Sequence, residues 1–322
     1  MNRLIVSQDG SGDFTTVQVA VDAVPEAGKE PWEILIRPGV YRERVVVNRD
    51  HLRLIGEDRQ RTVITWSACA RDPAPDGSER GTFLSFTLLL AADDCTVENL
   101  TVRNDAGDGS VAGQAVAVYA AGDRDVWRNC DLIACQDTLF CGPLMQKVLD
   151  DIAPRTANSE IVPFVGDCPL TRSRQFFEGC FIQGDVDYIF GPYRCWFERC
   201  TLFMNARGGW YTAANTPEEQ PWGMVFHDCR LTGACDRGKG WLGRPWRRFA
   251  RTLFLNCEMD ECVNPWGFVN WDEIRVITRR CGEWRTAGAR ADLSVRNPDA
   301  AVLTDEEAAC VTVEAVLNGW RP

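Results

Sequence analysis

Histidine is scarce in this sequence of 322 residues, in which only His51 and His227 occur. The G-x-S-x-G motif that surrounds the nucleophile of many serine hydrolases is missing. His51 falls on a turn and His227 within an apolar strand, so both are expected to be structural. The glycines of GDGSVAG (107–113) have no G-K-[ST] and no βαβ context. Serine-hydrolase chemistry and nucleotide binding are therefore not predicted.

Positive charge is also in short supply, because 35 Lys and Arg face 46 Asp and Glu, for a net charge of −11. This balance excludes nucleic acid as an expected partner, since such binding depends on neutralising phosphates. Long apolar runs are missing as well: the longest, residues 86–92, ends at Asp93 and Asp94, and MNRLIVSQDG has no apolar signal region. We predict no membrane partner and a cytoplasmic protein, or a secreted one if the sequence is truncated.

Cysteine is abundant, with 15 residues, but the number is odd and no C-x-x-C pair occurs. Two histidines are too few to complete several zinc sites, so reduced and buried thiols explain the cysteines better. No metal and no cofactor is predicted. Three C-x4-C pairs do occur, at Cys130/Cys135, Cys195/Cys200 and Cys257/Cys262.

The cysteines mark an imperfect repeat of short strands. An apolar or aromatic pair precedes the cysteine, and an apolar residue follows two positions later, in VWRNC130DL, QFFEGC180FI, CWFERC200TL, MVFHDC229RL and TLFLNC257EM. Repeats of 20 to 50 residues are typical of solenoids, whose coils stack equivalent side chains in ladders. We predict an all-β fold, a right-handed parallel β-helix formed by one domain over residues 1–322, and a monomer.

Helical patterns are confined to the two ends. Capping boxes are predicted at Thr15 with Gln18 and at Thr304 with Glu307, and the helices that follow would cap the solenoid. Residues 142–174 interrupt the strand rhythm, and we expect either a functional cover over a site or a locally mobile excursion.

Carboxylates remain as candidate catalytic groups. In DVDYIFG, strand alternation places Asp185 and Asp187 on one face and Val186, Tyr188 and Phe190 on the other, toward the core. Asp137 lies among apolar residues in ACQDTLF. Taken alone, these aspartates could equally be solvated or cap turns.

Four motifs occur in a fixed order: GQAVAV, CQDTLF, GDVDYIFG and WLGRPW. Together with VSQDGSGDFTTVQVAVDAVP near the N-terminus, LIRPGVYRERVVV and VLNGWRP, this set resembles the pectin methylesterases, or pectinesterases. The resemblance covers almost the whole chain apart from residues 142–174. It implies the same right-handed parallel β-helix, a cleft on its outer face, and no metal.

The resemblance also implies a role for six residues. Asp187 matches the nucleophile and Asp137 the general acid and base. Gln114 and Gln136 match the two glutamines that stabilise the oxyanion. Arg244 matches the arginine that binds the nucleophile, and Trp246 matches a platform for the substrate. Other aromatic residues are plausible in the cleft but cannot be ranked from the sequence: Trp210, Tyr211, Trp222, Trp241 and Trp271.

The residue types suit ester hydrolysis. Methanolate is a poor leaving group, so attack by a carboxylate needs a proton donor and hydrogen bonds to the oxyanion. We expect Arg244 to lower the pKa of Asp187, and burial and a neighbouring charge to keep Asp137 protonated. The predicted reaction is hydrolysis of galacturonate methyl esters in pectin or oligogalacturonides, and the excursion would favour short oligogalacturonides. The alternatives are a pectate lyase or polygalacturonase and a non-catalytic carbohydrate-binding solenoid.

Overall fold

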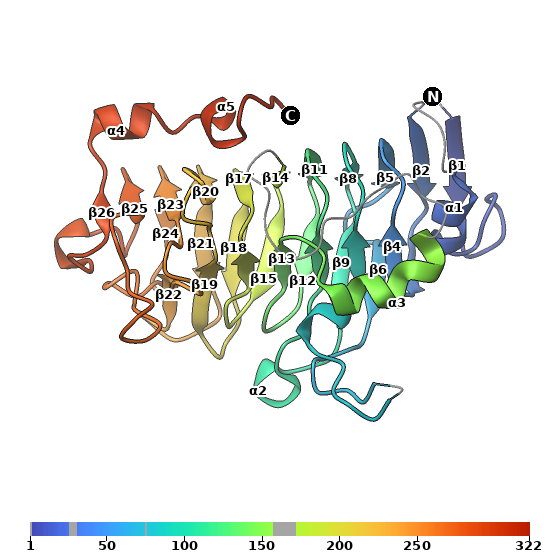
Figure 1. The fold of residues 1–322 in the computed structure, drawn as a ribbon, viewed down its shortest axis with the longest axis horizontal. Helices are drawn as coiled ribbons and strands as arrows, with labels where there is room; N and C mark the ends of the chain where they lie inside the picture. The colour runs from blue at the N-terminus through green and yellow to red at the C-terminus, as the bar shows by residue number, and fades with distance from the viewer. Residues whose placement is uncertain (1, 26–30, 75, 157–171) are drawn as a thin grey trace.

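The computed structural model describes residues 2–25, 31–74, 76–156 and 172–322, apart from the side chains of 153–156. Three parallel sheets run side by side along the long axis of the molecule (Figure 1). Between β2 (Trp32–Ile36) and β22 (Gly240–Gly243) the chain visits them in a repeating order, so that each coil contributes one strand to each sheet in turn. The predicted parallel β-helix is confirmed, and its crossovers are of the kind that are right-handed in almost all proteins.

Sheet A has 11 strands: β1 (Asn2–Val6), β2 (Trp32–Ile36), β5 (Leu52–Gly56), β8 (Thr96–Glu98), β11 (Asp125–Arg128), β14 (Arg174–Glu178), β17 (Arg194–Glu198), β20 (Met224–His227), β23 (Thr252–Leu255), β25 (Cys281–Trp284) and β26 (Ala301–Val302). Sheet B has eight: β3 (Gly39–Arg42), β6 (Thr62–Trp66), β9 (Thr101–Asn104), β12 (Asp131–Ile133), β15 (Phe181–Gly184), β18 (Thr201–Met204), β21 (Arg230–Gly233) and β24 (Glu258–Met259). Sheet C has seven: β4 (Val45–Val47), β7 (Leu88–Leu90), β10 (Val118–Ala120), β13 (Leu139–Cys141), β16 (Ile189–Gly191), β19 (Gly209–Ala214) and β22 (Gly240–Gly243).

The cysteine repeat forms the turn between sheets A and B. In five successive coils, one residue with a positive φ follows the sheet A strand and the cysteine comes next. The cysteines are buried in the interior and are free thiols, as the sequence predicts: Cys130, Cys180, Cys200, Cys229 and Cys257.

An aromatic ladder lies in the interior beside the cysteines. Trp127 stacks on Phe177, with ring centroids 5.9 Å apart, and Phe177 on Phe197 at 4.6 Å. The stack continues to Phe226 at 4.4 Å and to Phe254 at 4.7 Å. Because these residues are partners in the parallel register of sheet A, each ring covers the next, and the ladder holds five coils in one alignment.

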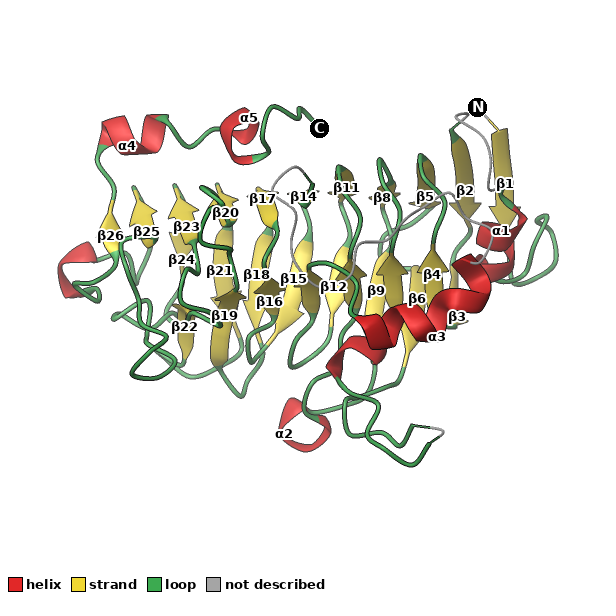
Figure 2. Ribbon diagram, viewed as in Figure 1, coloured by secondary structure: helices red, strands yellow, loops and turns green. Residues whose placement is uncertain are grey.

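Helices lie outside the three sheets (Figure 2). Helix α1 (Val17–Ala23) packs against β1, β2 and β4 at the start of the solenoid. The capping box predicted there is wrong: Thr16 is the N-cap and makes no side-chain bond, and both carboxylate oxygens of Glu43 accept the N–H groups of Val17 and Gln18 at 2.8 Å. The Gln18 side chain instead accepts the N–H of Val46 on β4, the edge strand of sheet C.

At the other end, the capping box of Thr304 and Glu307 is confirmed at the start of α4 (Asp305–Ala309). Contrary to the prediction, this helix does not cap the end of the solenoid. From β26 the chain turns back along sheet A, and α5 (Val313–Val316) packs against β17 (Figure 1). Val311 and Val316 join an apolar cluster on the outer face of that sheet, because this face carries Trp196, Val225 and other large apolar side chains.

The outer face of sheet C is covered near the middle of the chain. The 3-10 helix η1 (Thr82–Leu84) and α3 (Gln146–Thr156) pack together there with Tyr119 and Phe140. Helix α3 belongs to the predicted excursion, of which residues 157–171 lie outside the described residues. The expectation that helices are confined to the two ends is therefore wrong, because the 11 residues of α3 lie in the middle of the chain. Two further short helices are α2 (Gly109–Ala112) and η2 (Leu293–Val295). Within the described ranges, no helix combines the length and apolar composition needed to cross a bilayer.

Candidate functional site

The six residues singled out in the sequence meet in one cavity of about 340 Å³ on the outer side of sheet C. They come from four coils of the solenoid, and the coil of β19 lies between the third and the fourth of these. Gln114 precedes β10, Gln136 and Asp137 precede β13, Asp187 precedes β16, and Arg244 and Trp246 follow β22. The remaining lining residues are Thr82, Phe83, Phe190, Ala213 and Trp271.

Asp137 and Asp187 occupy the same place in neighbouring coils. Leu139 pairs with Ile189 in the sheet, and the N–H of Asp137 donates to the carbonyl of Val186 at 3.0 Å. Both aspartates have left-handed backbone angles, with φ of 63° and 52°. Such angles are uncommon outside glycine but Asp adopts them more readily than most residues, and here they turn both carboxyl groups toward the cavity.

This turn overrides the strand alternation expected for DVDYIFG. Strand β16 begins only at Ile189, after the left-handed Asp187. Tyr188 points into the interior as predicted, but the prediction for Phe190 is wrong, since its ring lies on the outer face and lines the cavity with Asp187. Phe190 also contacts the Trp246 ring, edge on, at 5.8 Å between centroids.

Asp185 lies outside this cavity. The residue is 2% exposed, and its carboxylate accepts the N–H of Val186 at 2.7 Å and lies 3.7 Å from the Arg207 guanidinium. The buried carboxylate of Asp185 is therefore stabilised by a neighbouring backbone amide and by the charge of Arg207.

Gln114 and Gln136 are adjacent across the coils. They form a parallel β-bridge, and the N–H of Ala115 donates to the carbonyl of Gln136 at 3.0 Å. The pairing places two amide side chains on one wall of the cavity, next to Asp137. Amide N–H groups at this position can donate to an oxygen that gains negative charge.

Arg244 forms a bidentate ion pair with Asp187 through its guanidinium. Its Nε donates to Asp187 Oδ1 at 2.9 Å and its Nη2 to Oδ2 at 2.7 Å. The guanidinium also lies over two indole rings, 3.6 Å from the Trp210 centroid and 3.8 Å from the Trp271 centroid. Stacking on the two indole rings restricts rotation of the guanidinium, so the cation is already oriented for its two hydrogen bonds to Asp187.

The two aspartates differ in their affinity for a proton. Burial raises the pKa of Asp137 well above that of an ordinary carboxyl, and the negative charge of Asp187 raises it further, against the effect of Arg244. Burial also raises the pKa of Asp187, while the bonds and charge of Arg244 oppose the shift. Arg244 thus acts on the pKa of Asp187 in the expected direction, but burial outweighs the cation and the net shift is upward. Only Asp187 is hydrogen-bonded to the Arg244 cation. When one of the two aspartates is ionised, the negative charge therefore lies on Asp187 and the proton on Asp137.

Several aromatic residues that the sequence left unranked are now placed. Trp271 lines the cavity and Trp210 supports Arg244 from strand β19. Trp241 is the register partner of Trp210 on β22, Tyr211 is buried in the interior, and Trp222 lines a different cavity. Phe83 was missed altogether: it reaches the site from η1, and no sequence motif links that segment to the aspartates.

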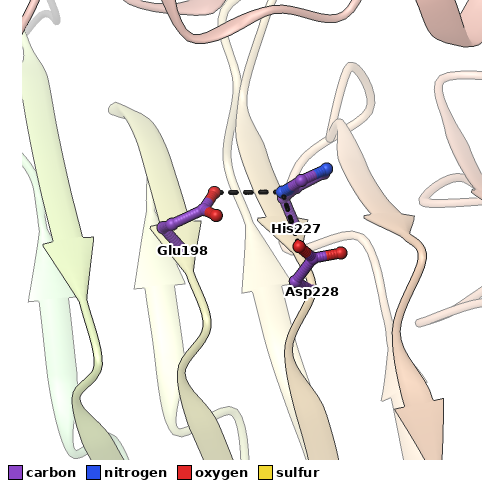
Figure 3. Close-up of side chains that lie close together, drawn as sticks. All are labelled: Glu198, His227 and Asp228. Atoms are coloured by element: carbon purple, nitrogen blue, oxygen red, sulfur yellow. Dashed lines mark hydrogen bonds and ion pairs between the residues drawn. The ribbon is translucent and has the colours of Figure 1, made fainter.

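One further cluster of ionisable side chains lies on the outer face of sheet A (Figure 3). His227 Nδ1 is 3.0 Å from Glu198 Oε2 and 3.7 Å from Asp228 Oδ2. Glu198 also accepts hydrogen bonds from Trp196 Nε1 and Arg199 Nη1, each at 2.8 Å. The hydrogen bond to Glu198 raises the pKa of His227, so an ion pair accounts for these contacts, and none of the C-x4-C cysteines belongs to the cluster.

Comparison with known proteins gives a consistent result. A family model described as Pectinesterase matches residues 3–147 and 169–319. Pectinesterase 31 of Arabidopsis thaliana is 31% identical over 310 residues, which are 94% of this chain and 88% of the relative.

Solved structures agree with this match. A crystal structure of pectin methylesterase in complex with hexasaccharide VII is 30% identical, with a TM-score of 0.79, and the alignment covers 100% of this chain and 98% of the other. The pectin methylesterase from carrot is 29% identical, with a TM-score of 0.81, over 99% and 94% of the two chains.

Proposed function

This chain belongs to the pectinesterase family, and on that premise we propose that Asp187 and Asp137 carry out its reaction as nucleophile and as general acid and base. The protein is a carboxylic ester hydrolase that acts on methyl esters in pectin. The alternatives of a pectate lyase or polygalacturonase and of a non-catalytic solenoid are thereby set aside. The roles of the individual side chains are the proposal.

The bidentate pairing of Arg244 with Asp187, beside a second buried aspartate, is the observation that carries the assignment. An oxygen of the ionised Asp187 attacks the carbonyl carbon of the ester, and the carbonyl oxygen takes up the negative charge. The amides of Gln114 and Gln136 donate hydrogen bonds to that oxygen. As the tetrahedral intermediate collapses, Asp137 gives its proton to the methoxy oxygen, and methanol leaves an acyl anhydride on Asp187.

The second half of the reaction returns each group to its starting state. Asp137, now ionised, takes a proton from a water molecule, and the oxygen of that water attacks the acyl carbon. The bond to Asp187 breaks, which releases the galacturonic acid unit and leaves Asp187 as a carboxylate in its bonds to Arg244. The new acid group then loses its proton to solvent and becomes galacturonate. Asp137 holds the proton again, in keeping with its raised pKa.

A pectin chain or a methylated oligogalacturonide is the ligand proposed for the cleft, in line with the hexasaccharide bound to the similar pectin methylesterase. The Trp246 indole is partly exposed at the cavity and would contact a sugar face. We expect no nucleic-acid or membrane partner, one domain over residues 1–322, and a monomer, which sedimentation analysis would test.

The excursion at residues 142–174 is proposed to influence the length of the substrate. Helix α3 packs on η1, which supplies Thr82 and Phe83 to the cavity, so the excursion supports one wall of the site. Replacing the excursion by a short turn should weaken the preference for short oligogalacturonides, measured as methanol release against chain length. Val148→Ala, which loosens the buried side of α3, tests the same point if the deletion does not fold.

The cytoplasmic location expected from the sequence is wrong. The relatives include pectinesterases of Arabidopsis thaliana and of carrot, and the pectin on which such enzymes act lies in the plant cell wall. An extracellular location replaces the earlier expectation.

Asp187→Asn tests the assignment of the nucleophile. The variant keeps the shape of the side chain and its position beside Arg244, but its amide cannot attack the ester. Methanol release from highly methylated pectin should fall to background while the thermal unfolding midpoint stays close to that of the wild type. Asp185→Asn is the matched control, since this neighbouring aspartate lies outside the cavity. Turnover that survives in Asp187→Asn would contradict the proposed role.

A further inference from the structure

A second cavity, of about 270 Å³, lies between the outer face of sheet A and the C-terminal segment. Its floor comes from the sheet and the loop before β20, and its cover comes from β26, α4 and the residues that follow. None of its lining residues takes part in the ester-hydrolysing site. The lining residues are Trp222, Arg251, Leu253, Arg279, Ala301, Leu303, Glu307, Cys310 and Val311.

Arg251 contributes a positive charge to this cavity, and no carboxylate is among the groups that shift its pKa. The side chain is partly buried and lies over the Trp222 ring, 4.5 Å from its centroid. Its Nε is buried without a hydrogen-bond partner, and no ion pair between its guanidinium and a carboxylate is found in the part of the chain that the structure describes. A buried donor without a partner costs free energy, so the position is incomplete as it stands.

The neighbouring groups add to this excess of positive charge. Burial and the adjacent Arg280 both lower the pKa of Arg251. Arg279 lines the same cavity, and Glu307 is the one acidic side chain among the lining residues, 4.0 Å from Arg279 and 51% exposed. Arg280 itself donates to the backbone carbonyls of Phe249 and Gln220. The balance of charge around Arg251 therefore favours an anion.

The other walls define what kind of anion fits. Leu253, Leu303 and Val311 are aliphatic, and the face of Trp222 completes an apolar surface beside the guanidinium. A small fully hydrated anion would gain nothing from these walls, whereas an organic acid would bury its body on them. We propose that this cavity is a binding site for a small organic monocarboxylate, whose carboxylate pairs with Arg251 and whose body packs on the apolar walls.

Such a ligand would join two parts of the molecule. Arg251 and Leu253 belong to the solenoid, while Leu303 and Val311 belong to the C-terminal segment, so one bound molecule would hold the segment on sheet A. Cys310 reports on this event, because its thiol is exposed at the rim of the cavity. The readout does not depend on esterase activity.

Alkylation of Cys310 by iodoacetamide tests the site, with the modified peptide quantified by mass spectrometry. Benzoate and galacturonate are the two probes, which distinguish an aromatic acid from a sugar acid, and phosphate is the inorganic comparison at equal ionic strength. At least one carboxylate should slow the alkylation in a saturable way, and phosphate should not. Arg251→Leu removes a charge-assisted bidentate contact and should weaken the apparent affinity by about tenfold or more.

Arg285→Leu is the matched control, because Arg285 also stacks on an indole at 4.5 Å but is paired with Asp305. It should leave the protection unchanged. Leu303→Trp fills the cavity with Arg251 intact and should abolish protection even if Arg251→Leu does not fold. Failure of both carboxylates to protect Cys310, equal protection by phosphate, or protection that persists in Arg251→Leu would each overturn the proposal.

Discussion

Replacing Arg244 by lysine isolates the contribution of the planar guanidinium. Arginine donates two parallel hydrogen bonds to Asp187, of 2.9 and 2.7 Å, and lies against two indoles at 3.6 and 3.8 Å. Lysine keeps the positive charge but has a single ammonium on a flexible stem, so it cannot hold both carboxylate oxygens in that geometry. The fold should persist, because Arg244 lies at the cavity and outside the interior ladders.

The size of the effect follows from the bond that is lost. A hydrogen bond to a charged group is worth about 1.5–3 kcal/mol, and about 1.36 kcal/mol in the activation barrier changes the rate tenfold. Loss of one such bond in the transition state therefore lowers kcat by about 10- to 150-fold. Arg244 also lowers the pKa of Asp187 against the effect of burial. A weaker partner lets that pKa rise, and because the nucleophile must be ionised, the acidic limb of the kcat profile moves to higher pH.

The assay is methanol release from highly methylated pectin at saturating concentration, measured across pH for the wild type and Arg244→Lys. Thermal unfolding of both proteins controls for stability. Trp210→Leu, which removes one supporting indole while leaving the guanidinium, should give a smaller fall in kcat in the same direction. A wild-type kcat in Arg244→Lys together with an unmoved acidic limb would refute the reasoning.

Three other expectations follow from the geometry. Asp137→Asn should abolish alcohol release from the methyl ester but spare part of the first-turnover alcohol release from a trifluoroethyl ester, whose alcohol leaves without a proton donor. Later turnovers should fail on both esters, because deacylation also uses Asp137, and equal first-turnover losses on both esters would argue against the acid role. Glu198 raises the pKa of His227, so its protonation stabilises the folded state below the unfolded value of about 6.5, and this stability is lost as pH rises through the higher folded value. Unfolding midpoints should therefore fall over that range in the wild type and not in His227→Gln, and parallel profiles would contradict the assignment. Phe226→Ala removes a fully buried ring from the centre of the aromatic ladder and should destabilise the fold by about 3–5 kcal/mol in urea titrations; a loss under about 1 kcal/mol would show that the stack adapts.

The repeat predicts the fold because each coil buries the same side chains in the same place. Cys130, Cys180 and the later members of the series stand after sheet A strands, and the printed sequence shows them directly. Helix ends are less readable. The Thr304 box needs only residues within one turn, whereas the N-terminus of α1 is satisfied by Glu43, which is 26 residues from Val17 and leaves no local signal.

Some features of the site were likewise readable from the sequence, and others were not. Asp137, Asp187 and Arg244 can be found from ordered motifs, and all lie in one cavity. The direction of Phe190 could not be found, because strand alternation holds only where backbone angles are regular and Asp187 is left-handed. The raised pKa of Asp187 was missed because burial depends on what the other coils place around it.

The sequence by itself determined the β-helix, the ladders of cysteine and aromatic residues, and the six polar and aromatic side chains of the site, since each depends on residue types repeated or ordered along the chain. Tertiary structure alone decided how those side chains meet. The stacking of coils brings Gln114 beside Gln136, places Arg244 between Trp210 and Trp271, and directs the C-terminal helices onto sheet A. These contacts join segments tens of residues apart, so their distances, burial and charge balance arise only when the coils are packed against one another.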